Sequence, residues 1–180
     1  MSDQPPRWTL LGERSTRDFH IFKTRTLDVA DPRDGKPYVR TVIEAPDWCN
    51  VIPVTRAGDV VLVRQFRFGT WSNHLEIPGG MLDPGEDPAT AAARELEEET
   101  GFRPARLEAL GTSHPNPAVF GNRLHTFLAL DCEQAHSGRQ DGSEDIRVEI
   151  VPRAELRRLV REGQITHALV LAALLFETWR

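Results

Sequence analysis

The stretch GGMLDPGEDPATAAARELEEETGF, residues 79–102, decides the fold of this chain. Asp87 followed by Pro88 is a good N-cap and first-turn pair. Gly101 stands where a helix commonly ends in a left-handed residue, for which glycine is suited. These start and stop signals predict a helix near 88–100.

The predicted helix has an apolar face beside an acidic one. At about 100° per residue, the apolar stripe comprises Ala89, Ala92, Ala93 and Leu96, and the acidic arc comprises Glu95, Glu98 and Glu99. Like charges three or four residues apart destabilise a helix by roughly 0.2–0.5 kcal/mol per pair. A divalent cation offsets this repulsion, because Mg²⁺ binds clustered carboxylate oxygens. The alternative is a solvated acidic face, which is what most glutamate runs are.

The spacing of the charged and glycine residues favours the metal site. After Gly80, the residues that define the pattern are Glu86, Arg94, Glu95, Leu96, Glu98, Glu99, Gly101 and Phe102. This pattern resembles the Nudix hydrolase box, G-x5-E-x7-R-E-U-x-E-E-x-G-U with U apolar, at every specified position. The resemblance implies an α/β fold, the Nudix α/β/α sandwich with a mixed sheet. It also implies hydrolysis of a nucleoside diphosphate linked to another moiety.

The resemblance assigns a metal-binding role to the acidic arc. It implies that Glu95, Glu98 and Glu99 bind Mg²⁺, with Mn²⁺ as an alternative, and that the Gly80 carbonyl supplies a further oxygen. Bound metal neutralises phosphate charge and makes a water nucleophilic, helped by a carboxylate that accepts the water's proton. The cofactor expected from the sequence is therefore a divalent cation.

Two further roles follow from the same resemblance. Glu86 and Arg94 lie on a different arc of the motif, and such a pair ties the loop to the helix in this family, so both are predicted to be structural. The catalytic base is expected in a late acidic loop, where DGSEDIRVEI resembles the branch that cleaves ADP-ribose, and Glu144 is the leading candidate. Asp141 and Glu98 are alternatives. A loop whose carboxylates only aid solubility is the competing interpretation.

Residues outside the box indicate which branch the chain resembles. VRQFRFGTWSNHLEIPGG, residues 63–80, is similar to the RQYR…ELPAG run of the ADP-ribose and nucleoside-diphosphate-sugar pyrophosphatases. Pro117 stands 16 residues after the last glycine of the box, as in that branch. Arg64 and Arg67 are predicted to share a strand face and to reach a diphosphate or the metal-ligand shell. Glu76 is expected to bind metal or ligand, and Pro117 to form a rim near the base or sugar.

Length and charge fit one compact domain with an extension. The chain has 180 residues and a formal net charge of −5, which gives no general attraction to nucleic acid or to an anionic membrane. Residues 1–45 are predicted to be a β-rich extension with two strands, and to build a homodimer by analogy with the branch. Residues 46–180 are predicted to be the Nudix domain. The lack of a signal-peptide pattern and of a long apolar run predicts a soluble, cytoplasmic protein.

The function predicted from these residues is Mg²⁺-dependent hydrolysis of the pyrophosphate bond of ADP-ribose or a related nucleoside diphosphate sugar. The products would be a nucleoside monophosphate and a sugar phosphate. One alternative is another Nudix pyrophosphatase, acting on dinucleoside polyphosphates or oxidised nucleotides. The length of the N-terminal extension and the presence of Pro117 argue against it. The other is a sensor that binds a nucleotide sugar without cutting it, against which the complete box speaks.

Overall fold

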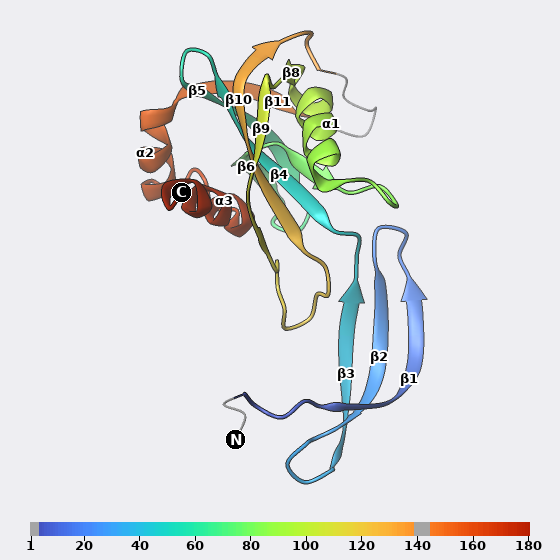
Figure 1. Ribbon diagram of the computed structural model, residues 1–180. Coiled ribbons are helices and arrows are strands. Elements are labelled where there is room, and N and C mark those ends of the chain that lie inside the picture. Colours follow the sequence, from blue (N-terminus) through green and yellow to red (C-terminus); the bar gives the residue numbers. More distant parts are fainter. Residues whose placement is uncertain (1–3, 139–144) are drawn as a thin grey trace. The chain divides into compact units, whose positions relative to one another are not determined.

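The computed structural model describes residues 4–138 and 145–180, and the chain divides into two compact units (Figure 1). The first unit comprises the chain up to Pro46 together with His114–Asn122, and the second comprises Asp47–Ser113 and Arg123–Arg180. No local signal in the sequence indicated that 114–122 belongs with the first unit. Among the helices of the described residues, none is long and apolar enough to span a membrane.

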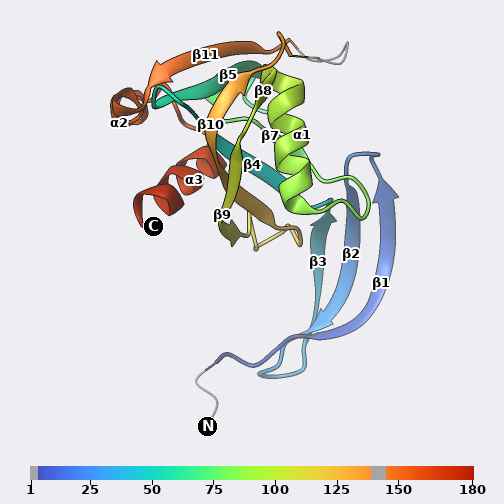
Figure 2. The ribbon, with the colours of Figure 1, turned by 45° about the horizontal axis from the view of Figure 1, so that its top comes forward.

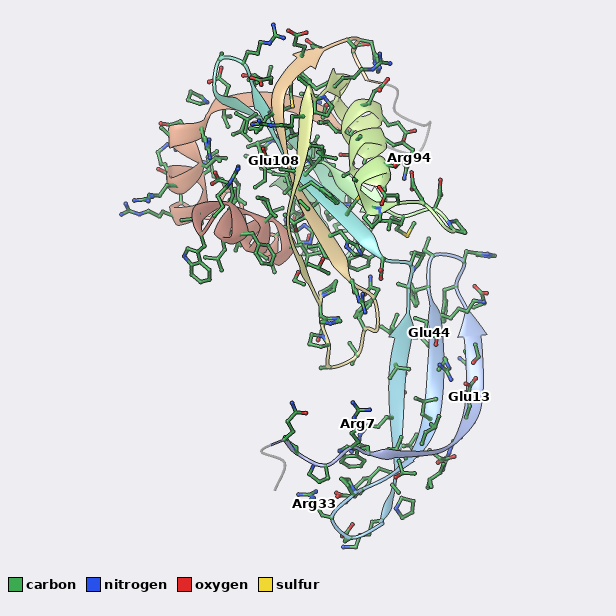
Figure 3. All side chains as sticks on the ribbon, in the orientation of Figure 1. Arg7, Glu13, Arg33, Glu44, Arg94 and Glu108 are labelled. Atoms are coloured by element: carbon green, nitrogen blue, oxygen red, sulfur yellow. The ribbon has the colours of Figure 1, made fainter. Side chains whose placement is uncertain are left out.

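The first unit is a three-stranded antiparallel sheet of β1 (Thr9–Asp18), β2 (Lys23–Ala30) and β3 (Pro37–Glu44). The sequence predicted two strands here, and β1 is an addition, because its segment TLLGERSTRD lacks the apolar–polar alternation of a half-buried strand. Charge pairs join the three strands: Arg25 of β2 donates to Glu13 of β1 at 2.7 Å and to Glu44 of β3 at 2.5 Å. Figure 3 labels the two glutamates.

The second unit is built on one mixed sheet. Its strands are β4 (Trp48–Thr55), β5 (Asp59–Arg67), β6 (Ser72–Glu76), β7 (Gly79–Met81), β8 (Phe102–Arg103), β9 (Arg106–Ser113), β10 (Leu124–Gln134) and β11 (Arg147–Pro152). The central order is β11-β5-β4-β10-β8, with β6, β7 and β9 paired to β5, β4 and β10. Strands β4 and β10 run parallel and the other pairs run antiparallel.

Helices cover both faces of this sheet (Figures 1 and 2). Helix α1 (Pro88–Thr100) packs on one face, while α2 (Leu156–Arg161), entered through the 3-10 turn η1 (Arg153–Glu155), and α3 (Ala168–Thr178) pack on the other. Side chains alternate between the faces along each strand. The core on the α1 face includes Val51, Val61, Phe127, Ala91, Ala92 and Leu96. The core on the other face includes Ile52, Val60, Leu62, Leu128, Leu156 and Val170. The predicted α/β/α sandwich is confirmed.

Helix α1 begins and ends as its sequence predicted. The Asp87 carboxylate accepts the backbone N–H groups of Ala89 and Thr90 at 3.1 Å each, and Gly101 closes the helix in the left-handed region at φ +77°. A Cβ at Gly101 would also collide with the His136 carbonyl, so both backbone angle and space require glycine there. Local capping chemistry therefore fixes the length of the helix that carries the acidic residues.

The buried face of α1 differs from the predicted apolar stripe. The buried residues are Ala91, Ala92, Leu96, Glu99 and Thr100, whereas Ala89 and Ala93 are only half-buried. Glu99 is buried where the loop before α1 meets the end of the helix, and its carboxylate accepts the Gly79 N–H at 3.2 Å. The apolar stripe alone could not reveal this contact, since it joins residues 20 positions apart in sequence.

Candidate functional site

The loop before α1 is tied to the helix by Arg94. Its guanidinium binds the Glu86 carboxylate in a two-pronged contact, Nε to Oε1 at 2.9 Å and Nη2 to Oε2 at 3.0 Å, and Nη2 also donates to the Met81 carbonyl at 3.2 Å (Figure 3). The hydrogen bond from Arg94, with help from the Asp83 N–H, lowers the pKa of the Glu86 carboxyl. Glu86 thus stays charged and holds the loop in one position.

The same guanidinium bridges two of the predicted metal ligands. Arg94 Nη1 lies 2.9 Å from Glu95 Oε1 and 3.0 Å from Glu98 Oε2. Glu98 is half exposed, whereas Glu99 is 4% exposed and turns toward the Gly79 N–H. The three carboxylates of the arc therefore differ in burial, and two of them, Glu95 and Glu99, lie against the glycine pair.

Within residues 4–138 and 145–180, no three His, Cys, Asp or Glu side chains converge closely enough to hold a metal ion as they stand. The reason is visible in the contacts: Arg94 draws Glu95 and Glu98 to itself, and Glu99 is engaged with Gly79. The donor set nevertheless fits a hard cation, because it consists of carboxylate oxygens beside an exposed face of α1. A Cβ at Gly80 would collide with the end of the Glu95 side chain, so the backbone approaches the arc closely at this glycine.

A cavity of about 390 Å³ opens beside the glycine pair, entirely within the second unit. Its lining residues come from β4, β5, β7, β10, the β6–β7 region and the start of α3: Trp48, Cys49, Asn50, Arg67, Glu76, Ile77, Gly79, Gly80, Met81, Leu124, His167, Leu169 and Val170. Gly79 and Gly80 therefore belong both to this cavity and to the surroundings of the carboxylate arc.

Glu76 is the buried charge of the cavity wall. Arg67 binds it in a two-pronged contact, Nε to Oε1 and Nη2 to Oε2 at 2.9 Å each, and His167 Nδ1 lies 2.7 Å from Oε2. Burial raises the pKa of Glu76, but the hydrogen bonds and charges of Arg67 and His167 outweigh it and hold the pKa at about 2. No spacing in the sequence indicated His167, because it lies 91 positions from Glu76.

The prediction that Arg64 and Arg67 share a strand face is wrong. Arg64 pairs with Glu149 of β11, Nε to Oε1 at 2.5 Å and Nη2 to Oε2 at 3.2 Å, and it does not line the cavity. Side chains on a strand alternate with a period of two, so residues three apart point to opposite faces. Only Arg67 of the two lies at the candidate site.

The remaining predicted site residues lie outside this arrangement. Pro117 falls in the segment His114–Asn122, which belongs to the first unit. Its role as a rim of the site therefore stays a prediction. Glu144, the predicted base, and its alternative Asp141 lie outside the described residues.

Known proteins resemble the chain over nearly its full length. The NUDIX domain family matches residues 49–174. The chain is 29% identical over 163 residues to an "ADP-ribose pyrophosphatase" of Bacillus subtilis, with 88% of each covered. It is 33% identical over 164 residues to a "GDP-mannose pyrophosphatase" of Cronobacter sakazakii, with 85% of each covered. A solved structure titled "ADP compounds hydrolase" superposes with a TM-score of 0.86 at 25% identity, covering 99% of this chain and 96% of that one.

Proposed function

The chain belongs to the NUDIX family and is a Nudix hydrolase, and from that premise we propose that it hydrolyses the pyrophosphate bond of ADP-ribose or a related nucleoside diphosphate sugar. The products would be a nucleoside monophosphate and a sugar phosphate. The resemblance to the ADP-ribose and nucleotide-sugar branch is confirmed by the relatives. One observation carries the proposal: Glu99 and Glu95 of α1 lie against Gly79 and Gly80, which also line the cavity.

Nudix hydrolases use divalent metals, and we propose Mg²⁺, with Mn²⁺ as an alternative. Glu95, Glu98 and Glu99 would hold it, with the Gly80 carbonyl as a further ligand. When bound, the ion would neutralise phosphate charge and lower the pKa of a water. Glu95 and Glu98 would have to leave Arg94 to do so, and Arg94 would remain fixed by Glu86.

Other residues of the chain would orient the substrate and move the proton. Glu144 is proposed to accept the proton of the attacking water. Asp141 and Glu98 are the alternatives, and the Glu98 carboxylate is half exposed. Arg67, held in place by Glu76, brings positive charge to the cavity wall, where a diphosphate would be stabilised by it.

The direct test is product analysis with a panel of substrates. The protein with Mg²⁺ is incubated separately with ADP-ribose, ADP-glucose, GDP-mannose and ATP, and the products are separated and quantified. We expect ADP-ribose to give AMP and ribose 5-phosphate faster than ATP is cleaved. Preference for ATP would remove the branch assignment and leave the Nudix hydrolase. Binding of nucleotide sugars without any turnover would instead favour a sensor.

Metal binding should be detectable without substrate. Because a native carboxylate cluster binds Mg²⁺ and the unfolded chain has no preformed site, the ion should stabilise the fold by roughly 1.4 kcal/mol at ten times its Kd. We therefore expect millimolar Mg²⁺ to raise the Tm by several degrees, as measured by calorimetry. Glu95→Gln should abolish the rise. Glu97→Gln is the matched control, since Glu97 on the same helix pairs with Arg103 and its substitution should leave the rise intact. A rise that persists in Glu95→Gln would place the metal elsewhere.

The proposed base gives a separate kinetic expectation. Glu144→Gln keeps the side-chain shape but removes the proton acceptor, so kcat should fall by about 100-fold while KM changes little. Steady-state kinetics with ADP-ribose measure both. Asp145→Asn, a charge removal at the neighbouring exposed residue, is the control and should behave as wild type. An unchanged kcat in Glu144→Gln would exclude Glu144 as the base.

We propose a homodimer built by the first unit. Among the described residues, few apolar side chains of this sheet are buried. A three-stranded sheet is stable on its own only when it has an apolar face that packs against another part of a protein. The exposed large apolar residues are Trp8, Leu10, Leu11, Phe19, Ile21, Tyr38 and Val39. Such a surface is suited to association with a second copy. The molar mass in solution, against 20.3 kDa for one chain, tests this. The cytoplasmic location stays a prediction.

A further inference from the structure

One ring nitrogen of His167, Nε2, has no hydrogen-bond partner among residues 4–138 and 145–180. His167 lines the cavity, and its side chain is 37% exposed. The other ring nitrogen, Nδ1, lies 2.7 Å from Glu76 Oε2. Within the same residues, the buried side-chain atoms that lack a partner are Asn50 Oδ1, Asn122 Oδ1 and Thr126 Oγ1. Since Nε2 is unpaired and is not one of these buried atoms, it has accessible surface.

The contact with Glu76 fixes how the ring is held. The Glu76 carboxyl has a pKa of about 2 and is therefore ionised at neutral pH. An ionised carboxylate only accepts hydrogen bonds, so the hydrogen in this contact is on Nδ1 of His167. Arg67 binds both oxygens of the same carboxylate at 2.9 Å each, which keeps the carboxylate in place. The ring is thereby held with Nδ1 toward Glu76 and with Nε2 pointing away from it.

Helix capping does not explain this histidine. His167 is the N-cap residue of α3, yet its side chain makes no capping hydrogen bond to the first turn. The residues that cap well are Ser, Thr, Asp and Asn, whose short side chains reach the backbone N–H groups. The imidazole is turned toward Glu76 of β6 instead. What the ring adds at this position is therefore an accessible nitrogen in the cavity wall.

We propose that His167 Nε2 binds a sugar hydroxyl of the nucleotide-sugar substrate, an inference that rests on the proposed function. A hydroxyl both donates and accepts, so it pairs with a neutral ring, whose Nε2 accepts, and with a charged ring, whose Nε2 donates. A phosphate oxygen without a proton only accepts, and it pairs with the charged ring alone. The hydroxyl is thus the group of the substrate that satisfies Nε2 in either state of the ring.

The neighbours of His167 also fit a sugar. Arg67 Nη2 and His167 Nδ1 both contact Oε2 of Glu76, so the two side chains lie next to each other on the cavity wall. With the diphosphate at Arg67, the group beside it at His167 is a sugar, because a sugar is attached to each end of the diphosphate. Leu169 and Val170 line the cavity nearby and suit the C–H groups of a sugar ring. The volume of about 390 Å³ is near the lower end of ligand pockets and holds one moiety of the substrate.

The test replaces His167 by asparagine, whose amide can replace Nδ1 as the donor to Glu76 but has no counterpart of Nε2. Asparagine is also a favoured N-cap residue, so the fold should be retained. With Mg²⁺ and ADP-ribose, we expect KM to rise about tenfold and kcat to change little, because a bond made equally in the ground and transition states contributes to binding only. If His167 served only to hold Glu76 and Arg67, His167→Asn would keep the wild-type KM and only His167→Ala would raise it.

Two competitive inhibitors identify the hydroxyl: ADP, and dideoxy-ADP, which lacks both ribose hydroxyls. An unchanged Ki for ADP in His167→Asn, together with the higher KM for ADP-ribose, would assign the contact to the terminal sugar. A higher Ki for ADP with an unchanged Ki for dideoxy-ADP would assign it to the nucleoside ribose, and either result supports the inference. Equal losses for all three ligands would indicate a contact with phosphate and overturn it. Unchanged values for all three would mean that Nε2 meets only water, which also overturns it.

His125→Asn is the matched control. The Nε2 of His125 lies 3.2 Å from Asp47 Oδ2, so this histidine also contacts a carboxylate, but it does not line the cavity. Its substitution should leave KM and both Ki values as in wild type. Turnover of ADP-ribose by the wild-type protein decides the proposed function separately from these comparisons. If wild type cleaves no nucleotide sugar, the proposed function fails and the inference fails with it.

Discussion

Replacing Glu99 by glutamine is expected to lower kcat for nucleotide-sugar hydrolysis by about three orders of magnitude. Removal of a carboxylate metal ligand forfeits several kcal/mol of charge stabilisation in the transition state, and each 1.36 kcal/mol is about tenfold in rate. Of the three glutamates, Glu99 should give the largest loss of kcat when it is substituted. It is buried against Gly79, so a water molecule cannot readily take its place as a metal ligand. The measurement is kcat with saturating Mg²⁺ and ADP-ribose.

The fold of the Glu99→Gln variant should remain intact. Glutamine keeps an oxygen that can accept the Gly79 N–H, and the change removes like charge from the arc formed with Glu95 and Glu98. The Tm without metal should therefore be equal to or slightly above that of wild type. Glu97→Gln, the same substitution at a residue that faces Arg103 and His136, should keep near-wild-type turnover. Near-wild-type turnover in Glu99→Gln would contradict the assignment of Glu99 as a metal ligand.

Replacing Arg67 by methionine is expected to lower the free energy of unfolding by about 3 kcal/mol and the Tm by roughly 6–12 °C. The change removes the two-pronged partner of the buried Glu76 carboxylate and leaves His167 beside it, and breaking a buried ion pair by removing one partner is strongly destabilising. We take the lower end of the usual loss of stability for a broken buried ion pair, because the Arg67 side chain is 42% exposed and solvent screens its charge. Denaturant unfolding measures the effect.

The matched control for Arg67 lies on the same strand. Arg64→Met breaks the half-exposed pair with Glu149 and should cost less than about 1 kcal/mol. The double variant Arg67→Met with Glu76→Leu should recover most of the lost stability, because it removes the buried Glu76 carboxylate as well as its partner Arg67. Equal losses in the two single arginine variants would contradict the placement of Arg67 at a buried charge.

The pair of Arg67 and Glu76 also predicts that the free energy of unfolding depends on pH. The folded-state pKa of Glu76 is about 2, below its ordinary value of 4.5, so the carboxylate contributes stability that is complete above about pH 4.5. That contribution is lost as the pH falls from there toward 2. The difference in stability between wild type and Arg67→Met should therefore shrink over this window and be constant at neutral pH.

Local chemistry in the sequence determined the α1 region. An N-cap aspartate, a first-turn proline and a closing glycine act within a few residues of one another, so Asp87, Pro88 and Gly101 were sufficient to predict the bounds of the helix. The box spacing gave the family for the same reason, because its residues lie on one loop and one helix. Strands were less certain: β1 was missed because its side chains are mostly exposed and carry no alternation.

Tertiary structure decided the partners of the charged and polar residues. The face of α1 that is buried, the pairing of Arg64 with Glu149, and the meeting of His167 with Glu76 depend on which strands and helices become neighbours. Local periodicity cannot specify contacts between residues 85 or 91 positions apart. Asn50 is a further case, because its side-chain amide donates to the Leu169 carbonyl, 119 positions away in sequence.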